Sequence, residues 1–291
     1  MTIDSKEEIH CRVVKELRQH LNNSGRGLTN ILQIAVCGSS GKGIASDQSD
    51  FDVKVLLLHP QKCYLLQKVK ESWHSTFSFE YNEEDETDNN VTTTTIEIDA
   101  TFIDYLRMIK YISKSDMTAY EMFAGDVIYT TPEAKVLDEL WKQAYLPAVL
   151  ARQYTGLLNL YLRKPRKTDE NQGSNGRSNK IAFEAVYLEH KLRFIEKHGT
   201  SEIPPFKAFE LIQRSDTTSE EQQWAKDLLK ARREQKNKDV DSKHIEKFGS
   251  FVRQPTLGNK IKIVWDADPK DRERLRQQLE DMFLDAITER Q

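Results

Sequence analysis

The sequence VCGSSGKGIASDQSDFDVKVLLL (residues 36–58) joins two apolar segments through a Gly-Ser pair and an Asp-x-Asp pair. The first apolar segment, residues 31–37, ends at the Gly-Ser pair, and the second, residues 53–58, begins directly after the Asp-x-Asp pair. Both are rich in β-branched and other large apolar side chains, which predicts two strands of one sheet. Carboxylates at the start of such a strand are costly unless they are paired or bind a cation, so Asp50 and Asp52 indicate metal and phosphate chemistry rather than packing.

Asp50 and Asp52 lie two residues apart, so in a strand their side chains share a face, with Cα atoms roughly 6.5–7 Å apart. The two carboxylates repel each other unless a cation lies between them. Mg²⁺ prefers oxygen ligands and keeps waters and substrate phosphates in its shell. Two such ions, about 3.5–4 Å apart, stabilise the attacking and leaving oxygens of an in-line displacement. The pattern predicts a site for two Mg²⁺ ions, with Mn²⁺ as the alternative, that acts on a nucleoside triphosphate.

A site of this kind normally needs a third carboxylate, and the segment VTTTTIEIDA (residues 91–100) offers two. Its β-branched residues predict a strand in which Glu97 and Asp99 point to the same face. If this strand lies beside residues 51–58, either residue completes the cluster. Asp99 is favoured because it lies nearer the end of the strand, and Glu97 stays open.

The Gly-Ser pair predicts a phosphate-binding turn. Gly38 allows the backbone to turn sharply, and Ser39 with the neighbouring backbone N–H groups can hold triphosphate oxygens. Ser40 and Lys42 lie close enough in sequence to contribute. A P-loop is excluded, because its GxxxxGK[ST] pattern would need a glycine at position 36 and a serine or threonine at position 43.

The composition describes a polar chain that is still able to bury a core. It has 291 residues, 38% hydrophobic and 31% charged, with a net charge of −3, so a nucleic acid would have to bind a local basic patch. Its three cysteines lack CxxC spacing, which indicates free thiols in a reducing compartment. The sequence has no signal-peptide pattern and no apolar run of roughly 20 residues, so we expect a cytoplasmic protein without a membrane partner. The oligomeric state stays open.

The first part of the chain alternates helices and strands, whereas the second is almost entirely helical. We therefore expect an α/β core over residues 1–134, with a mixed or antiparallel sheet, and a helical domain over residues 135–291 that closes over the cleft. The further elements expected in the core are helices at 2–22, 63–73 and 102–113 and a strand at 76–81. The helices expected beyond it are 134–164, 180–198, 206–214, 219–238 and 269–288, with a polar loop at 165–179.

Two lysines are further candidates for phosphate binding. Lys180 ends a basic run that starts at residue 163, and this run suits a triphosphate or a polynucleotide end as well as it suits a solvated loop. Lys110 lies on the helix after the third carboxylate, where a triphosphate contact and a solvated helix face are equally good interpretations. The basic run at 226–238 is interleaved with acidic residues, which favours a solvated face.

The spacing from Gly-Ser to Ser-Asp-x-Asp resembles the nucleotidyltransferase superfamily of DNA polymerase β. More closely, the chain resembles the RNA-repair-associated nucleotidyltransferases of the DNA polymerase β type, the YcgL-like family. The stretches that carry the resemblance are residues 38–58, 99–129, 154–162 and 180–212. The resemblance implies a polymerase-β-like core, with Gly38 and Ser39 as the nucleotide-binding turn and Asp50, Asp52 and Asp99 as metal ligands.

The chain also departs from the pattern of that family. Ser40 stands where the family tends to have an arginine, and Lys42 where it tends to have an aromatic residue. Tyr187 occupies the position at which an arginine is expected, and Lys191 or Arg193, one helical turn further on, can take its place. These departures concern how the triphosphate is held, since all three carboxylates are present.

The resemblance implies metal-dependent transfer of a nucleoside monophosphate from a nucleoside triphosphate to an acceptor hydroxyl, with release of pyrophosphate. It favours an RNA 3′ end, for example that of tRNA, as the acceptor. Asp50 and Asp52 would bind both metals, and Asp99 would bind the catalytic metal and help to deprotonate the hydroxyl. Two alternatives stay open: transfer of AMP to a protein or small molecule, and a catalytically silent module that binds nucleotide or RNA.

Overall fold

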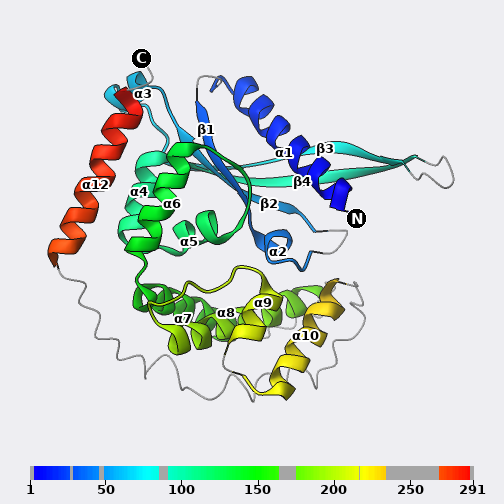
Figure 1. Cartoon of the computed structure of the whole chain (residues 1–291). Coiled ribbons are helices and arrows are strands. Elements are labelled where there is room, and N and C mark those ends of the chain that lie inside the picture. The colour runs from blue at the N-terminus through cyan, green and yellow to red at the C-terminus, as the bar shows by residue number, and fades with distance from the viewer. Residues whose placement is uncertain are drawn as a thin grey trace.

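The computed structural model describes residues 3–26, 29–45, 49–84, 91–163, 175–215, 217–233 and 269–288 (Figure 1). A single five-stranded sheet with the order β3-β4-β2-β1-β5 forms the centre of the fold. Its strands are β1 Asn30–Val36, β2 Phe51–Leu58, β3 Ser72–Glu84, β4 Val91–Asp104 and β5 Asp126–Thr130. Only the pairing of β2 with β4 is parallel within this sheet. The α/β fold class with a mixed sheet is therefore confirmed.

One face of the sheet is covered by α1 (Ile3–Asn23), whose position confirms the helix predicted at residues 2–22. Its side chains at helical spacing, from Ile9 to Leu21, are buried against Val55 and Phe102. The other face is covered by α4 (Tyr105–Ser113), α5 (Met117–Ala124) and α6 (Pro132–Ala144). Strands β1, β2 and β4 thus send alternate residues into two separate apolar clusters, whereas the apolar residues of β3 and β5 join only the cluster under α1.

Most of the other described helices form a layer below the sheet and one arm beside it (Figure 1). The layer consists of α7 (Pro147–Arg163), α8 (Asn175–His198), α9 (Ala208–Arg214) and α10 (Ser219–Arg233). The arm, α12 (Pro269–Thr288), packs against α4 and α6. The centroid of its Phe283 ring also lies 5.1 Å from that of Tyr64, which precedes β3. The division of the chain at residues 134 and 135 stays a prediction.

The helix predicted at residues 63–73 was wrong. The structure has only a short helix there, α3 (Gln61–Leu65), and the backbone of Gln67 has φ of 52°. This left-handed conformation ends the helix. Leu65, on this short helix, is 75% exposed. Trp73 instead belongs to β3, where its ring stacks on Phe102 at 4.8 Å.

The single helix predicted at residues 134–164 is two helices, α6 and α7. The backbone of Tyr145 is extended, and Pro147 starts the second helix. A proline disfavours helical conformation in the residue before it and lacks the N–H that would continue a helix. The helix predicted at 102–113 starts at Tyr105, because residues 102–104 still pair with β2 and Asp104 caps the helix.

Two elements were missed by the sequence analysis, α5 and β5. Both are short, and β5 forms one edge of the sheet by pairing with β1. The helix predicted at 180–198 begins earlier, at Asn175. Most of the loop at 165–179 and residues 234–238 lie outside the described residues. None of the described helices combines the length and the apolar character that crossing a membrane requires.

Candidate active site

The parallel pairing of β2 and β4 brings Asp52 beside Asp99. The two residues are register partners, and neighbouring strands lie about 4.8 Å apart, so both carboxylates project from the same face of the sheet. Both side chains are partly exposed at the edge of the apolar cluster under α4 and α5. Glu97 precedes the part of β4 that pairs with β2, and it is exposed. The register thus places Asp99, and not Glu97, beside Asp52.

Asp50 lies just before β2 rather than inside the strand, and its side chain is exposed. The Ser40 hydroxyl donates to the Asp50 carbonyl oxygen at 3.4 Å, which connects the Gly-Ser turn to this residue. The chain therefore brings Asp50 to the same end of β2 as Asp52, while leaving the Asp50 carboxylate open to solvent.

The Gly-Ser turn packs directly against the Asp52 carboxylate. It forms the single-turn helix α2 (Gly38–Gly41), in which Gly38 has φ of +53°. A Cβ atom built on Gly38 would lie 1.7 Å from Asp52 Oδ2. The N–H of Cys37 also donates to the Asp52 carbonyl at 2.8 Å. Glycine is required at position 38 both for its backbone conformation and for this close approach.

A histidine that the sequence analysis did not single out lies at the third carboxylate. His74 Nε2 is 2.6 Å from Asp99 Oδ1, and both side chains are partly exposed. His74 belongs to β3, which is antiparallel to β4, and it pairs with Thr101. The predicted strand began at residue 76, whereas β3 begins at Ser72. A strand predicted from residue 72 would have included His74 and placed its side chain on one face of the sheet by the alternation of side chains.

Behind Asp52, the same face carries a partly buried ion pair. Lys54 Nζ lies 3.1 Å from Glu121 Oε2, which projects from α5. Burial alone would lower the pKa of Lys54, but the Glu121 carboxylate beside it raises that pKa, so the ammonium stays charged. Burial also raises the pKa of the nearby Cys37 thiol, which remains protonated and therefore a poor nucleophile. Lys54 supplies a fixed positive charge two residues from Asp52.

The three lysines predicted to bind nucleotide have different surroundings. Lys42 is only 8% exposed, and its Nζ lies 2.6 and 2.7 Å from the two carboxylate oxygens of Glu184 on α8. Lys110 pairs with Glu71 at 3.0 Å, and the Glu71 carbonyl accepts from the N–H of Asp104 at the C-terminal end of β4, beyond Asp99, so the structure does not bring Lys110 to the carboxylates. Lys180 lies in α8, and its side chain is outside the described part of the structure.

Lys191 and Arg193, which could replace the family's arginine, lie on α8 and are bound to side chains of the helical layer. Lys191 is fully buried, with Nζ 3.2 Å from the Tyr154 hydroxyl. Burial places the pKa of Lys191 well below its usual range. Arg193 pairs with Glu189 at 3.1 Å and with Glu221 at 3.2 Å. Both side chains therefore stabilise the helical layer.

The carboxylates at this end of the sheet are oxygen donors, the type of ligand that a hard divalent cation takes. Across the described ranges, no three or more His, Cys, Asp or Glu side chains are grouped closely enough to hold an ion. Asp52 and Asp99 nevertheless offer oxygen donors side by side. This pair fits a hard divalent cation that takes its remaining ligands from substrate phosphates and water.

Comparison with known proteins bears out the family resemblance. A search of curated proteins finds no match. A search of solved structures finds a nucleotidyltransferase-like protein from Exiguobacterium sibiricum, 10% identical, with 94% of this chain and 88% of that chain covered and a TM-score of 0.25. The model of the RNA repair pathway DNA polymerase beta family matches residues 9–285, nearly the whole sequence. The chain therefore belongs to the RNA repair pathway DNA polymerase beta family.

Proposed function

We propose that this protein is a metal-dependent nucleotidyltransferase that moves a nucleoside monophosphate from a nucleoside triphosphate to an acceptor hydroxyl. The observation that carries the proposal is the pairing of Asp52 with Asp99 across parallel strands, with Gly38 packed against Asp52. Two carboxylates beside a phosphate-sized turn are the parts that phosphoryl-type transfer needs, since such catalysis rests on positioning and charge neutralisation.

In this reaction the acceptor oxygen attacks the α-phosphorus, the bond between the α-phosphorus and the bridging oxygen breaks, and pyrophosphate leaves. Divalent ions, when bound, supply neutralisation of the phosphate charge and activation of the hydroxyl. Asp50 and Asp52 would hold both metals, and Asp99 would bind the catalytic metal and help to deprotonate the acceptor hydroxyl. Gly38, Ser39 and Ser40 hold the triphosphate oxygens through backbone N–H and hydroxyl groups.

The proposed acceptor is an RNA 3′ end, and the name of the family supports this choice. Transfer of AMP to a protein or small molecule would use the same carboxylates and differ only in the molecule whose hydroxyl group lies beside Asp99. A silent nucleotide-binding module would keep the turn and lose the chemistry. Mg²⁺, with Mn²⁺ as the alternative, is the proposed metal because the donors are oxygen atoms.

The test is label transfer from each of four α-³²P nucleoside triphosphates to total RNA, with Mg²⁺ or Mn²⁺ present. Asp52→Asn and Asp99→Asn are compared with Asp285→Asn, an exposed carboxylate on α12 that serves as the matched control. We expect labelled RNA with the unmutated chain and the control, and a loss of about a hundredfold or more in the other two variants.

The other outcomes separate the alternatives. Label found on protein or on a small molecule, and not on RNA, would replace the acceptor and keep the chemistry. Nucleotide binding without any labelled product would favour the silent module. Equal labelling by Asp52→Asn and the unmutated chain would refute the proposed role of the carboxylates.

A further inference from the structure

The nucleotide-binding turn proposed above is held on its outer side by the helical layer. Lys42, the residue that caps α2, has its ammonium between the two carboxylate oxygens of Glu184, at 2.6 and 2.7 Å. The same ammonium lies 4.8 Å from the centroid of the Tyr187 ring. Glu184 and Tyr187 both belong to α8, so the side chain of Lys42 is bound entirely to that helix.

The backbone of the turn is held as well. The N–H of Ala208, at the start of α9, donates to the Lys42 carbonyl at 3.0 Å. The ring of Phe206 packs on Gly41, where an added Cβ would lie 2.9 Å from Phe206 Cε1 and 2.3 Å from the Val36 carbonyl oxygen. We name these four contacting residues of the turn and the helical layer, Lys42, Glu184, Phe206 and Ala208, the turn clamp.

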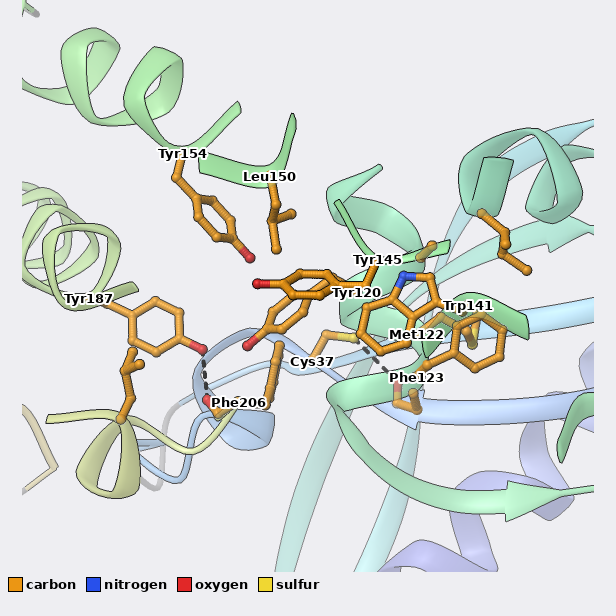
Figure 2. Close-up of a cluster of buried hydrophobic side chains, with 14 of the residues drawn as sticks. Cys37, Tyr120, Met122, Phe123, Trp141, Tyr145, Leu150, Tyr154, Tyr187 and Phe206 are labelled. Carbon is orange, nitrogen blue, oxygen red and sulfur yellow. Dashed lines mark hydrogen bonds between the residues drawn. The ribbon is translucent and has the colours of Figure 1, made fainter. Parts of the chain in front are cut away.

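The helical side of the clamp is itself fixed. The Tyr187 hydroxyl donates to the Phe206 carbonyl at 2.6 Å, and Figure 2 shows this bond beside the cluster of buried aromatic rings. The Tyr120 hydroxyl, from α5 of the core, reaches the carbonyls of Pro204 and Pro205 at 3.0 and 3.1 Å. The segment before α9 is therefore tied both to α8 and to the core, and it can set the position of α2.

From these contacts we infer that Lys42 is a positioning residue, which fixes the nucleotide-binding turn against α8 through Glu184, and not a ligand of the triphosphate. A lysine that bound phosphate directly would have to leave Glu184, and removing one partner of a largely buried pair is strongly unfavourable. The inference rests on the proposed function, because it concerns the turn that would hold the triphosphate. It makes nucleotide affinity depend on the docking of the helical layer.

The test uses the full chain and compares Lys42→Met, Glu184→Gln and the exchanged pair Lys42→Glu/Glu184→Lys. Binding of ATP, GTP, CTP and UTP is measured by titration calorimetry, and unfolding is followed by its midpoint temperature. We expect each single variant to lower nucleotide affinity by about tenfold through displacement of the turn, and to lower the midpoint by about 5 °C. The exchanged pair should recover most of both losses.

Recovery by exchange separates positioning from direct contact, because Lys42→Glu would place a carboxylate beside the phosphates if residue 42 touched them. Lys42→Arg should also keep affinity, since a guanidinium matches a carboxylate with two hydrogen bonds. Lys142→Met is the matched control, because it removes an exposed lysine that pairs with Asp138 and Glu139 on α6. It should change neither the nucleotide affinity nor the midpoint temperature.

Three results would overturn the inference. The first is Glu184→Gln keeping or raising nucleotide affinity while Lys42→Met and the exchanged pair lose it, since that pattern marks Lys42 as a phosphate ligand. The second is a lowered midpoint with unchanged affinity in both single variants, which would make the pair merely structural. Absence of nucleotide binding by the unmutated chain would instead refute the proposed function, and the inference with it.

Discussion

Replacing Gly38 with alanine perturbs the centre of the proposed site with a single methyl group. The added Cβ would lie 1.7 Å from Asp52 Oδ2 and 2.5 Å from its Cγ, well inside the 3.0 Å that real Cβ contacts respect. The Asp52 carboxylate must therefore move by more than about 1 Å, or the turn must move away from it. The left-handed backbone at φ of +53° adds a conformational cost of about 1–2 kcal/mol for a residue other than glycine.

The displacement at Asp52 and the backbone cost at Gly38 are distinguished by measuring activity and stability separately. A displacement of about 1 Å at a catalytic group can reduce activity about a hundredfold, so we expect Gly38→Ala to lose at least that much kcat/KM. Its unfolding free energy, measured in urea, should fall by at least the backbone cost of about 1–2 kcal/mol. Label transfer at saturating and at limiting nucleotide then shows whether turnover or binding is affected.

Gly199→Ala is the matched control. Gly199 has φ of +56°, nearly the same conformation, and nothing lies within 4 Å of an added Cβ. It should show the loss of stability without the loss of activity. Activity of Gly38→Ala similar to that of Gly199→Ala would refute the claim that the close approach of the turn to Asp52 matters for catalysis.

Three further predictions concern stability. His190 is buried, hydrogen-bonded to Ser215, and burial lowers its pKa to about 4 from 6.5, so the unfolded chain binds the extra proton first and stability falls as the pH drops from 6.5 to 4. The loss should be about 3 kcal/mol in urea unfolding, and His190→Gln should remove it. Asp104→Ala removes the cap of α4 and the acceptor of the Tyr64 hydroxyl, which should cost about 3 kcal/mol by the same measurement. Phe283→Ala should cost about 2 kcal/mol and increase amide hydrogen exchange in α12, because the ring packs on Tyr64.

Each of these has an outcome that would contradict it. An unchanged acid dependence in His190→Gln would mean that another group titrates over this range. Asp104→Asn keeps an acceptor for the cap, so it should be less harmful than Asp104→Ala, and equal losses would contradict the capping argument. Unchanged exchange in α12 after Phe283→Ala would show that this contact does not hold the helix in place.

Much of the fold follows from local pattern. Helical spacing of apolar residues predicted α1, and two apolar runs around the Asp-x-Asp pair predicted β1 and β2. The errors arose where local pattern and tertiary packing disagree. Leu65 has the spacing of a buried helix residue but is exposed, because the left-handed backbone of Gln67 ends the helix. Trp73 lies in β3 instead of a helix, with its ring stacked on Phe102.

The candidate site was predictable only in part, for a similar reason. Asp52 and Asp99 were singled out from their strands, but their register depends on which strands pair, and that is decided by packing across the sheet. Lys42 and Glu184 are 142 residues apart, so no sequence spacing could connect them. From its place near the Gly-Ser pair, Lys42 was therefore predicted to bind phosphate, whereas the structure pairs it with Glu184 on α8.

Transfer of the α-phosphate and not the γ-phosphate tests the central claim most directly. The protein is incubated with acceptor RNA and Mg²⁺ or Mn²⁺, with α-³²P-labelled triphosphate in one set of reactions and γ-³²P-labelled triphosphate in the other, for each of the four nucleotides. A nucleotidyltransferase attaches the α label to the acceptor and releases the γ label as pyrophosphate. Label transferred from the γ position, or an equal yield when Asp52 and Asp99 are both replaced by asparagine, would contradict the account.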